Sequence, residues 1–524
     1  MPKFKPYDFN QSSMVVINYR DQLQSGTFEH AIHYLIHSKL DLSIFDDLYS
    51  NDNGGRPAYD PAILLSIVLF AYSKGITSSR EIQWCCETNI IFKALSCDTV
   101  PHWTTIAKFV SRYPKKITDL FEQVLLICHE EGLLGNELFA IDGCKMRSDA
   151  AKEWSGKFHE LEKKRAKLKR QIKYHLKEHK KHDKENTEAN ERRQQRTEQT
   201  INTLEKNFNK IDQFLKTNTP RMGQGKKKTE VKSNITDNES AKMTTSKGTI
   251  QGYNGVATVD KKHQVVIDAT AFGAGQEHHT LAPVLETVLQ RYRKLGISPD
   301  IYEEQVIVTA DTGFANEQNM KMLKEHEINA YIPDNKFRSR DPKFQDQKET
   351  YGKRHSNPAK SKTKDFYRRE DFDYDPIAKT CVCPKGEAMW FSHEHIDNRG
   401  DRRIAFEGRL SKCSACPDKK KCMRNPKAAD HRKGHGRVVT FRLEKATQNP
   451  YTEWMKPRVD SPKGKEIYSH RMSVVEPVFG NIGTNKGLNR FSLRSQAKVD
   501  GQWKLYCMVH NIEKWFKYGH LTTQ

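Results

Sequence analysis

Two short apolar runs, far apart in the chain, each end in an aspartate that is soon followed by glycine. The run over 137–142 ends at Asp142, and the run over 305–311 ends at Asp311. Each run has the length of a buried strand, and we expect Gly143 to end the first one. Further elements of the same sheet are predicted as a strand hairpin at 252–260 and 263–271, a helix at 280–295 and a strand at 328–333. Strands and helices in this order predict an α/β fold with a mixed sheet.

The composition excludes two broad classes of protein. The 524 residues are 36% hydrophobic and 10% aromatic, which is too apolar for a wholly disordered chain. The longest nearly unbroken apolar run, 62–72, is about half the ~20 residues that a membrane-spanning helix needs. The first residues contain no apolar signal core, so we expect a cytoplasmic protein whose cysteines stay reduced. A formal charge of +22 favours a polyanionic partner such as nucleic acid, although it also serves plain solubility.

Residues 1–125 are predicted to form a helical N-terminal domain. Its first clear helix follows Asp60, which is placed as an N-cap. A later helix over 104–113 carries the basic residues Lys108 and Arg112 beside its apolar residues. Short helices with a basic face fit a helix-turn-helix-like DNA reader. The alternative is an ordinary helical domain with a solvated basic side.

The segment 152–247 interrupts the predicted sheet. Apolar residues repeat at heptad spacing in two stretches, over 154–175 and over 201–215. This pattern predicts an antiparallel helical hairpin, followed by a flexible basic connection over 217–247. The basic surface of the hairpin is either a solvated face or an arm that contacts the DNA backbone.

A third carboxylate stands in an apolar context within the segment 468–480. If Glu476 is buried among its neighbouring valines, it needs a counter-charge from Arg471 or from a divalent cation. Pro477 implies either a helix that begins there or one that is bent there. Three carboxylates could hold Mg²⁺ or Mn²⁺, which are hard ions that favour oxygen ligands and can work in pairs at a phosphodiester.

Several of the 11 cysteines cluster inside a polar insertion at 335–465. Cys413 and Cys416 have the spacing of a zinc knuckle. The expected ligands of a structural Zn²⁺ are Cys383, Cys413, Cys416 and Cys422. The alternative ligands are Cys381, His431 and His435. Without a metal, these cysteines would be scattered reduced thiols.

These motifs resemble a bacterial insertion-sequence transposase of the DDE type, in the insertion-sequence group eleven-eighty-two. The matching segments are IDG at 141–143, GYN at 252–254, ADTGF at 310–314, VEPVFG at 475–480, the tail at 491–494 and His510 with Asn511. The most specific of them is VEPVFG with Tyr468 and Arg471 upstream. IDG by itself is common.

The resemblance implies an RNase H-like catalytic domain over 126–524, with Asp142, Asp311 and Glu476 as a triad that binds Mg²⁺ or Mn²⁺. It implies cleavage of double-stranded DNA at the ends of the element, followed by strand transfer, with a homodimer in the DNA complex. Tyr468 and Arg471 would handle the DNA end near the active site.

Two positions depart from the family's pattern. Four residues separate Arg471 from Glu476 instead of the usual three, and Gly483 stands where a lysine is expected. The expected lysine would contact a DNA phosphate. Lys486 could reach the same phosphate from the next helical turn. The alternatives are therefore a decayed transposase that only binds DNA, and an RNase H-like nuclease without strand transfer.

Overall fold

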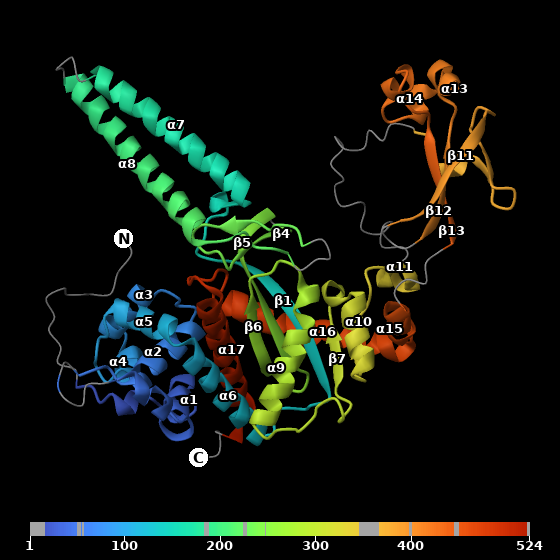
Figure 1. The fold of residues 1–524 in the computed structure, drawn as a ribbon. Helices are drawn as coiled ribbons and strands as arrows, with labels where there is room; N and C mark the ends of the chain where they lie inside the picture. The colour runs from blue at the N-terminus through green and yellow to red at the C-terminus, as the bar shows by residue number, and fades with distance from the viewer. Residues whose placement is uncertain are drawn as a thin grey trace, which may run out of the picture. The chain divides into compact units, whose positions relative to one another are not determined.

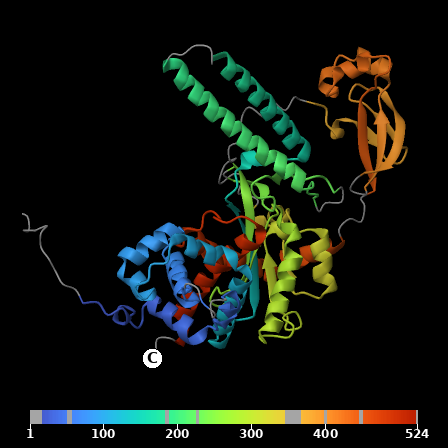
Figure 2. The ribbon, with the colours of Figure 1, turned by 60° about the vertical axis from the view of Figure 1, so that its left-hand side comes forward.

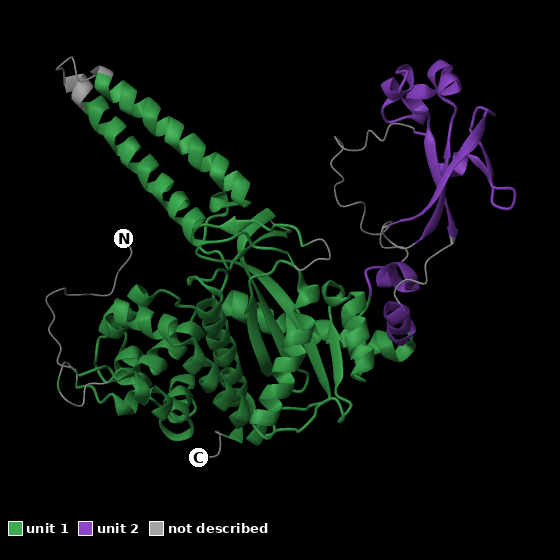
Figure 3. Cartoon of the chain, in the orientation of Figure 1, with its two compact units in different colours: residues 1–333, 461–524 green, residues 334–460 purple. Residues whose placement is uncertain are grey.

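The chain divides into two compact units. The computed structural model describes residues 16–49, 54, 57–182, 188–223, 228–246, 248–344, 366–397, 401–444 and 450–520. One unit comprises residues 1–333 and 461–524, and the other comprises residues 334–460 (Figure 3). None of the helices in these described ranges combines the length and the apolar character that crossing a membrane requires.

The first unit is built around a mixed sheet. Its strands are β1 (Leu138–Arg147), β4 (Ala241–Thr245), β5 (Gly248–Asp260), β6 (Val266–Phe272), β7 (Ile307–Ala310) and β8 (Ala330–Tyr331). β1 is antiparallel to β5 and parallel to β7, and β8 is parallel to β7. β5 also pairs antiparallel with β4 and β6, which follow one another along its other edge. The predicted α/β fold with a mixed sheet is confirmed, and its strands follow the order β6–β5–β1–β7–β8.

Helices cover both faces of this sheet (Figure 1). They are α9 (Leu281–Lys294), α10 (Glu317–Glu325), α16 (Pro462–Gly480) and α17 (Gln496–Tyr518). Because side chains alternate along a strand, β1 meets different helices on its two faces. Phe139 packs edge-on against Tyr292 of α9, whereas Asp142 meets Arg471 of α16. On β5, Trp503 of α17 donates its Nε1–H to the Val256 carbonyl at 2.9 Å.

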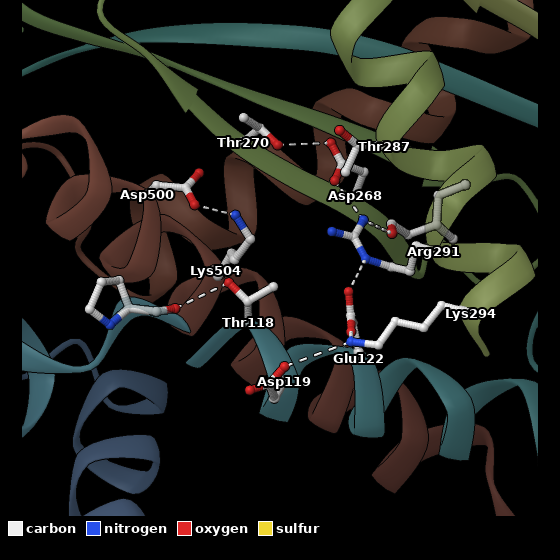
Figure 4. Close-up of polar contacts among 12 residues, drawn as sticks. Thr118, Asp119, Glu122, Asp268, Thr270, Thr287, Arg291, Lys294, Asp500 and Lys504 are labelled. Carbon is white, nitrogen blue, oxygen red and sulfur yellow. Dashed lines mark hydrogen bonds and ion pairs between the residues drawn. The ribbon is translucent and has the colours of Figure 1, made fainter. Parts of the chain in front are cut away.

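The N-terminal helices pack into the same unit. They are α1 (Phe28–Tyr34), α2 (Pro61–Ser73), α3 (Ser79–Thr88), α4 (Ile90–Leu95), α5 (Trp103–Arg112) and α6 (Pro114–Glu130). As predicted, Asp60 caps α2, accepting the Ala62 N–H at 2.7 Å. A buried ion network ties α6 to the sheet (Figure 4). Arg291 of α9 is 4% exposed and lies 2.6 Å from Asp268 Oδ1 of β6 and 3.3 Å from Glu122 Oε1 of α6.

The predicted helical hairpin is formed by α7 (Phe158–His182) and α8 (Glu188–Thr217), which run side by side (Figure 1 and Figure 2). Its apolar seam contains Leu161, Leu168, Ile211 and Phe214. Arg165, the charged residue within the first heptad seam, forms an ion pair with Asp212 across the hairpin at 2.8 Å. A polar member of the seam is thus tolerated because its charge has a partner.

The connection after the hairpin is more ordered than the sequence suggests. Its described parts are 217–223 and 228–246, and the second of them contains β4 and the short strand β3 (Ser233–Asn234), which pairs with β2 (Ser155–Gly156). Asp237 is 5% exposed and accepts the Tyr253 hydroxyl at 2.9 Å. The expectation of a flexible connection is therefore wrong for these residues, since polar side chains there are buried and paired; 224–227 and 247 lie outside the described residues.

The second unit is a small sheet with short helices. Its strands are β9 (Asp373–Asp375), β10 (Thr380–Val382), β11 (Ala388–Ile396), β12 (Arg402–Glu407) and β13 (Val438–Glu444). Its helices are α11 (Phe337–Arg340), α13 (Leu410–Ala415), α14 (Lys419–Cys422) and α15 (Pro450–Asp460). All neighbouring strands pair antiparallel around a core that includes Phe406 and Phe441. Within the polar insertion predicted at 335–465, residues 345–365, 398–400 and 445–449 lie outside the described part.

Candidate active site

Asp142, in the middle of β1, lies beside Asp311, which directly follows the parallel strand β7. In the register of β1 and β7, Ile141 pairs with Ala310, so the two aspartates are the next residues on neighbouring strands. Both carboxylates contact one guanidinium: Arg471 Nη1 lies 2.8 Å from Asp142 Oδ2, and Arg471 Nη2 lies 3.7 Å from Asp311 Oδ1. The two aspartates thus converge on a single positive charge.

Arg471 reaches this point from α16, which packs against β1 and β7. It is 7% exposed, and its Nε has no hydrogen-bond partner among the described residues. Burial alone would lower the pKa of Arg471, but the charges of Asp142 and Asp311 outweigh it, so the pKa is raised overall. Tyr468, one turn earlier, donates its hydroxyl to Asp311 Oδ1 at 3.3 Å. Its ring centre lies 5.6 Å from the guanidinium carbon.

The strand around Asp142 differs from the prediction. β1 does not end at Gly143 but continues to Arg147, because Gly143 pairs with Val256 of β5. A β-carbon on Gly143 would lie 2.9 Å from Asn254 Oδ1, so the glycine serves a close approach between strands. Its N–H donates to Asp142 Oδ1 at 2.8 Å. Burial raises the pKa of Asp142, and Arg471 and this hydrogen bond oppose the rise.

Glu476 does not join this group. It lies on the exposed side of α16 and makes no hydrogen bond or ion pair among the described residues. Five residues of helix rotate it by about 140° from Arg471, because one turn takes 3.6 residues. The expected ion pair between Glu476 and Arg471 is absent in this part of the chain, since Arg471 points at the aspartates. The premise that Glu476 is buried among valines is wrong.

Pro477 neither begins α16 nor breaks it, because the helix runs from Pro462 to Gly480. A proline inside a helix leaves the carbonyl four residues earlier without its N–H donor. That carbonyl belongs to Ser473, and it accepts the Gln264 side-chain amide at 3.0 Å instead. A side chain from the turn after β5 therefore satisfies the carbonyl that the proline leaves open.

A further carboxylate, missed by the sequence reasoning, lies beside the aspartates. Glu277 follows β6 and lies 3.5 Å from Lys145 of β1; its Oε1 accepts the Asn254 amide at 3.4 Å. Burial raises the pKa of Glu277, and the charge of Asp142 adds to the rise. A β-carbon on Gly313, two residues after Asp311, would collide with its side chain. The GYN motif at 252–254 was the sequence signal that could have pointed to Glu277, because its asparagine, Asn254, contacts that side chain.

These side chains fit part of a metal site. No group of three His, Cys, Asp or Glu residues within the described ranges is arranged to hold a metal ion. Asp142 and Asp311 nevertheless share one cation, and their oxygens are the ligands that Mg²⁺ and Mn²⁺ prefer. The guanidinium of Arg471 stands where such a cation would neutralise both carboxylates.

The four predicted zinc ligands gather in the second unit. Cys383, Cys413, Cys416 and Cys422 line one cavity of about 50 Å³. The alternative Cys381 lies apart from it, 1% exposed in the apolar core against Met389. Gly408 allows Cys413 to approach the backbone closely, since a β-carbon at position 408 would lie 2.7 Å from Cys413 Sγ. Burial raises the pKa of Cys422 to about 11, and the neighbouring thiols contribute to the rise.

Two family models match the chain, one at each end. A Transposase DDE domain matches residues 382–516, which include Tyr468, Arg471, Glu476 and the four cysteines that line the cavity. A Transposase domain (DUF772) matches residues 17–112, which span α1 to α5. Both models describe transposase domains, and together they indicate an insertion-sequence DDE transposase. No curated protein and no solved structure matches it.

The remaining DNA-contact residues predicted for this transposase lie in two different settings. Lys108 and Arg112 are exposed on α5, whose Ile106, Phe109 and Val110 are buried. Lys486 is fully buried and forms an ion pair with Glu513 of α17. A phosphate could reach Lys486 only if that pair broke, so its placement does not favour the expected DNA contact.

Proposed function

We propose that this transposase binds the ends of an insertion sequence as a homodimer and catalyses Mg²⁺- or Mn²⁺-dependent cleavage and strand transfer. The observation that carries the proposal is the convergence of Asp142 of β1 and Asp311, which follows the neighbouring strand β7, on one cation. DDE transposases generally use a divalent metal. We infer that the enzyme acts in the cytoplasm, on the DNA of the nucleoid.

In this proposal Asp142 and Asp311 hold the metal, which supplies charge stabilisation at the phosphodiester and activation of the attacking oxygen. Water would attack the scissile phosphorus and break its bond to the 3′-oxygen, which leaves a 3′-hydroxyl on one side and a 5′-phosphate on the other. That 3′-hydroxyl would then attack a phosphodiester of the target strand and displace the target's own 3′-oxygen as a hydroxyl. We keep Glu476 as the third metal-binding residue because of its place in the VEPVFG motif. Glu277 adds negative charge near both aspartates.

Arg471 and Tyr468 have a second role in this proposal. The guanidinium of Arg471 would pair with a DNA phosphate, for which arginine geometry is suited, in a complex where a divalent cation would neutralise the aspartates. Tyr468 stays beside Asp311 and orients the DNA end. Lys108 and Arg112 contact the duplex from the N-terminal helices, and Lys486 is left out because of its buried pair with Glu513.

For the second unit we propose a structural Zn²⁺ held by Cys383, Cys413, Cys416 and Cys422. A shell of four thiolates leaves no open position, so this metal would stabilise the fold and take no part in catalysis. The shared cavity and the small residue at Gly408 support this assignment.

The second candidate function is a DNA-binding protein without catalysis. Two observations favour it: Arg471 fills the space between the aspartates, and Gly483 replaces the expected lysine. A nicking assay with Mg²⁺ on DNA that carries the element's ends separates the two functions, and joined products would exclude a nuclease without strand transfer.

Asp311→Asn tests the assignment directly. We expect loss of nicking with DNA binding largely intact, because the change removes a metal-binding charge and keeps the shape of the side chain. Asp46→Asn, at an exposed position in the N-terminal helices, is the matched control and should nick like the wild type. Normal nicking by Asp311→Asn would mean that the triad is misassigned.

A further inference from the structure

A groove of about 580 Å³ lies where the base of the helical hairpin meets the end of β1. Basic side chains dominate its charged lining, with five basic residues against Asp149 and Glu153. The five are Arg147, Lys152, Lys210, Arg490 and Arg494. A smaller hollow of about 370 Å³ shares Trp154, Lys210 and Arg494 with it and extends it along α8. None of these residues has a part in the site described above.

The backbone builds the basic wall from segments that are far apart in the chain. Arg147, the last residue of β1, forms a parallel bridge with Arg490, and its carbonyl accepts the Phe491 N–H at 2.8 Å. Asp149 then holds the second arginine, because its Oδ2 lies 2.9 Å from Arg494 Nη2. Arg490 Nη2 lies 3.6 Å from the same carboxylate. Two arginines are thus positioned by one aspartate while more than half of each side chain stays exposed.

The other three cations have no such partner. Among the described residues, Arg147, Lys152 and Lys210 are exposed and form no ion pair. Ser148, which also lines the groove, is 6% exposed, and its hydroxyl has no hydrogen-bond partner in this part of the chain. A buried hydroxyl without a partner costs free energy, which a ligand acceptor would remove. Unpaired cations and an unused donor together fit a ligand that carries several anionic oxygens.

We propose that this groove binds the phosphate backbone of the element-end DNA as it leaves the active site. The proposal rests on the function proposed above. Arg147 lies five residues beyond Asp142 on the same strand, which is about 16 Å at the rise of a β-strand. That distance is about five base-pair steps of B-DNA, since each step rises 3.4 Å. The groove therefore contacts phosphates about five steps from the scissile one, and the hairpin base provides its outer wall.

The test removes the three unpaired charges together, as Arg147→Gln, Lys152→Gln and Lys210→Gln, in the full-length protein. Asp149 keeps both of its arginines in this variant, so folding should be preserved. The control replaces three exposed lysines elsewhere in the first unit, Lys261, Lys321 and Lys324, with glutamine. Binding to end DNA is measured over a range of salt concentrations. The slope of log K against log salt should fall by about 0.9 for each phosphate that the groove variant no longer neutralises, and remain unchanged in the control.

A crosslink gives the position of the groove on the DNA. A photoreactive group on Arg147→Cys should react with DNA about five nucleotides from the cleavage site, by the same strand-rise estimate. If the wild type nicks end DNA but the groove variant keeps the full salt slope, the groove proposal is wrong and the proposed function stands. If the groove variant loses only RNA or acidic-protein binding, the groove serves another partner and the proposal is overturned. If the wild type neither binds nor nicks end DNA, the proposed function fails first.

Discussion

At the scale of single residues, the centre of the site is one arginine between two carboxylates. Asp142 and Asp311 could be predicted from the sequence, because each follows an apolar strand, and strand ends of a sheet are where ligands are met. The pairing of Arg471 with these two aspartates could not be predicted from the sequence. Arg471 pairs with them only because α16 packs across β1 and β7, and helix packing over such a separation leaves no local sequence pattern.

Arg471→Gln should destabilise the first unit by about 2–3 kcal/mol, because it leaves two partly buried carboxylates without their counter-charge. Millimolar Mg²⁺ should restore part of this stability, since the aspartates would then share a divalent cation. Urea unfolding with and without Mg²⁺ measures both effects. The double change Arg471→Gln with Asp311→Asn is the control and should show little Mg²⁺ effect. If Mg²⁺ stabilises the single and double variants equally, the two aspartates do not form a cation site.

At the scale of elements, the sequence predicted five of the six strands in the sheet of the first unit, the helix α9 and the helical hairpin, because their apolar periods are local. It missed where strands end. Gly143 looked like a stop, yet the strand continues because the glycine packs beneath Asn254. It also missed β4, whose residues carry few apolar side chains and are ordered by pairing with β5. Glu476 was misjudged for a related reason, since its apolar neighbours face the sheet while Glu476 itself faces outward.

The ion network in Figure 4 gives a prediction about how α6, α9 and β6 are held together. Arg291→Met should cost about 3–5 kcal/mol of unfolding free energy, because Asp268 would remain buried without its cation, whereas Glu122 would keep Lys294 at 2.6 Å. Arg293→Met, two residues along α9, removes an exposed pair with Asp300 and should cost less than about 1 kcal/mol. Urea unfolding of both variants checks the difference. Equal losses would mean that the buried network contributes no more than a surface pair.

His510 gives the contact between α16 and α17 a pH dependence. Its Nε2 lies 2.9 Å from the Gln264 carbonyl and its Nδ1 lies 3.0 Å from the Asn481 amide, so the neutral ring satisfies both partners. Burial lowers the pKa of His510 to about 3. The unfolded chain binds this proton below about pH 6.5, and the folded protein does not until far lower, so stability falls with decreasing pH in that window.

Between pH 7.5 and pH 5, His510 alone should reduce the unfolding free energy by about 2 kcal/mol. His510→Gln keeps a donor and an acceptor but cannot bind the proton, so it should lose correspondingly less over the same range. Denaturant unfolding at the two pH values measures the loss in each protein. Identical losses in the two proteins would show that His510 is not the titrating group.

At the scale of the whole molecule, the sequence separated the cysteine-bearing insertion from the catalytic elements, because its composition changes abruptly. Composition could not decide which cysteines share a cavity. Cys381 lies within β10 and is buried in the core, whereas Cys383 follows the end of the strand and lines the cavity, so the difference depends on where the strand ends. The boundaries predicted for the domains remain a prediction.

The division into two units leads to a prediction about zinc. If the four cysteines hold Zn²⁺, a chelator should destabilise residues 334–460 while residues 1–333 and 461–524 stay folded, because metal-binding free energy is folding free energy for a small site. Limited proteolysis after chelation should then cut within 366–444, and added Zn²⁺ should restore protection. Cys416→Ser should be cut without a chelator, whereas Cys97→Ser, at an exposed cysteine of the first unit, should behave like the wild type. Protection that persists after complete zinc removal would mean that the cavity is closed by packing of thiols alone.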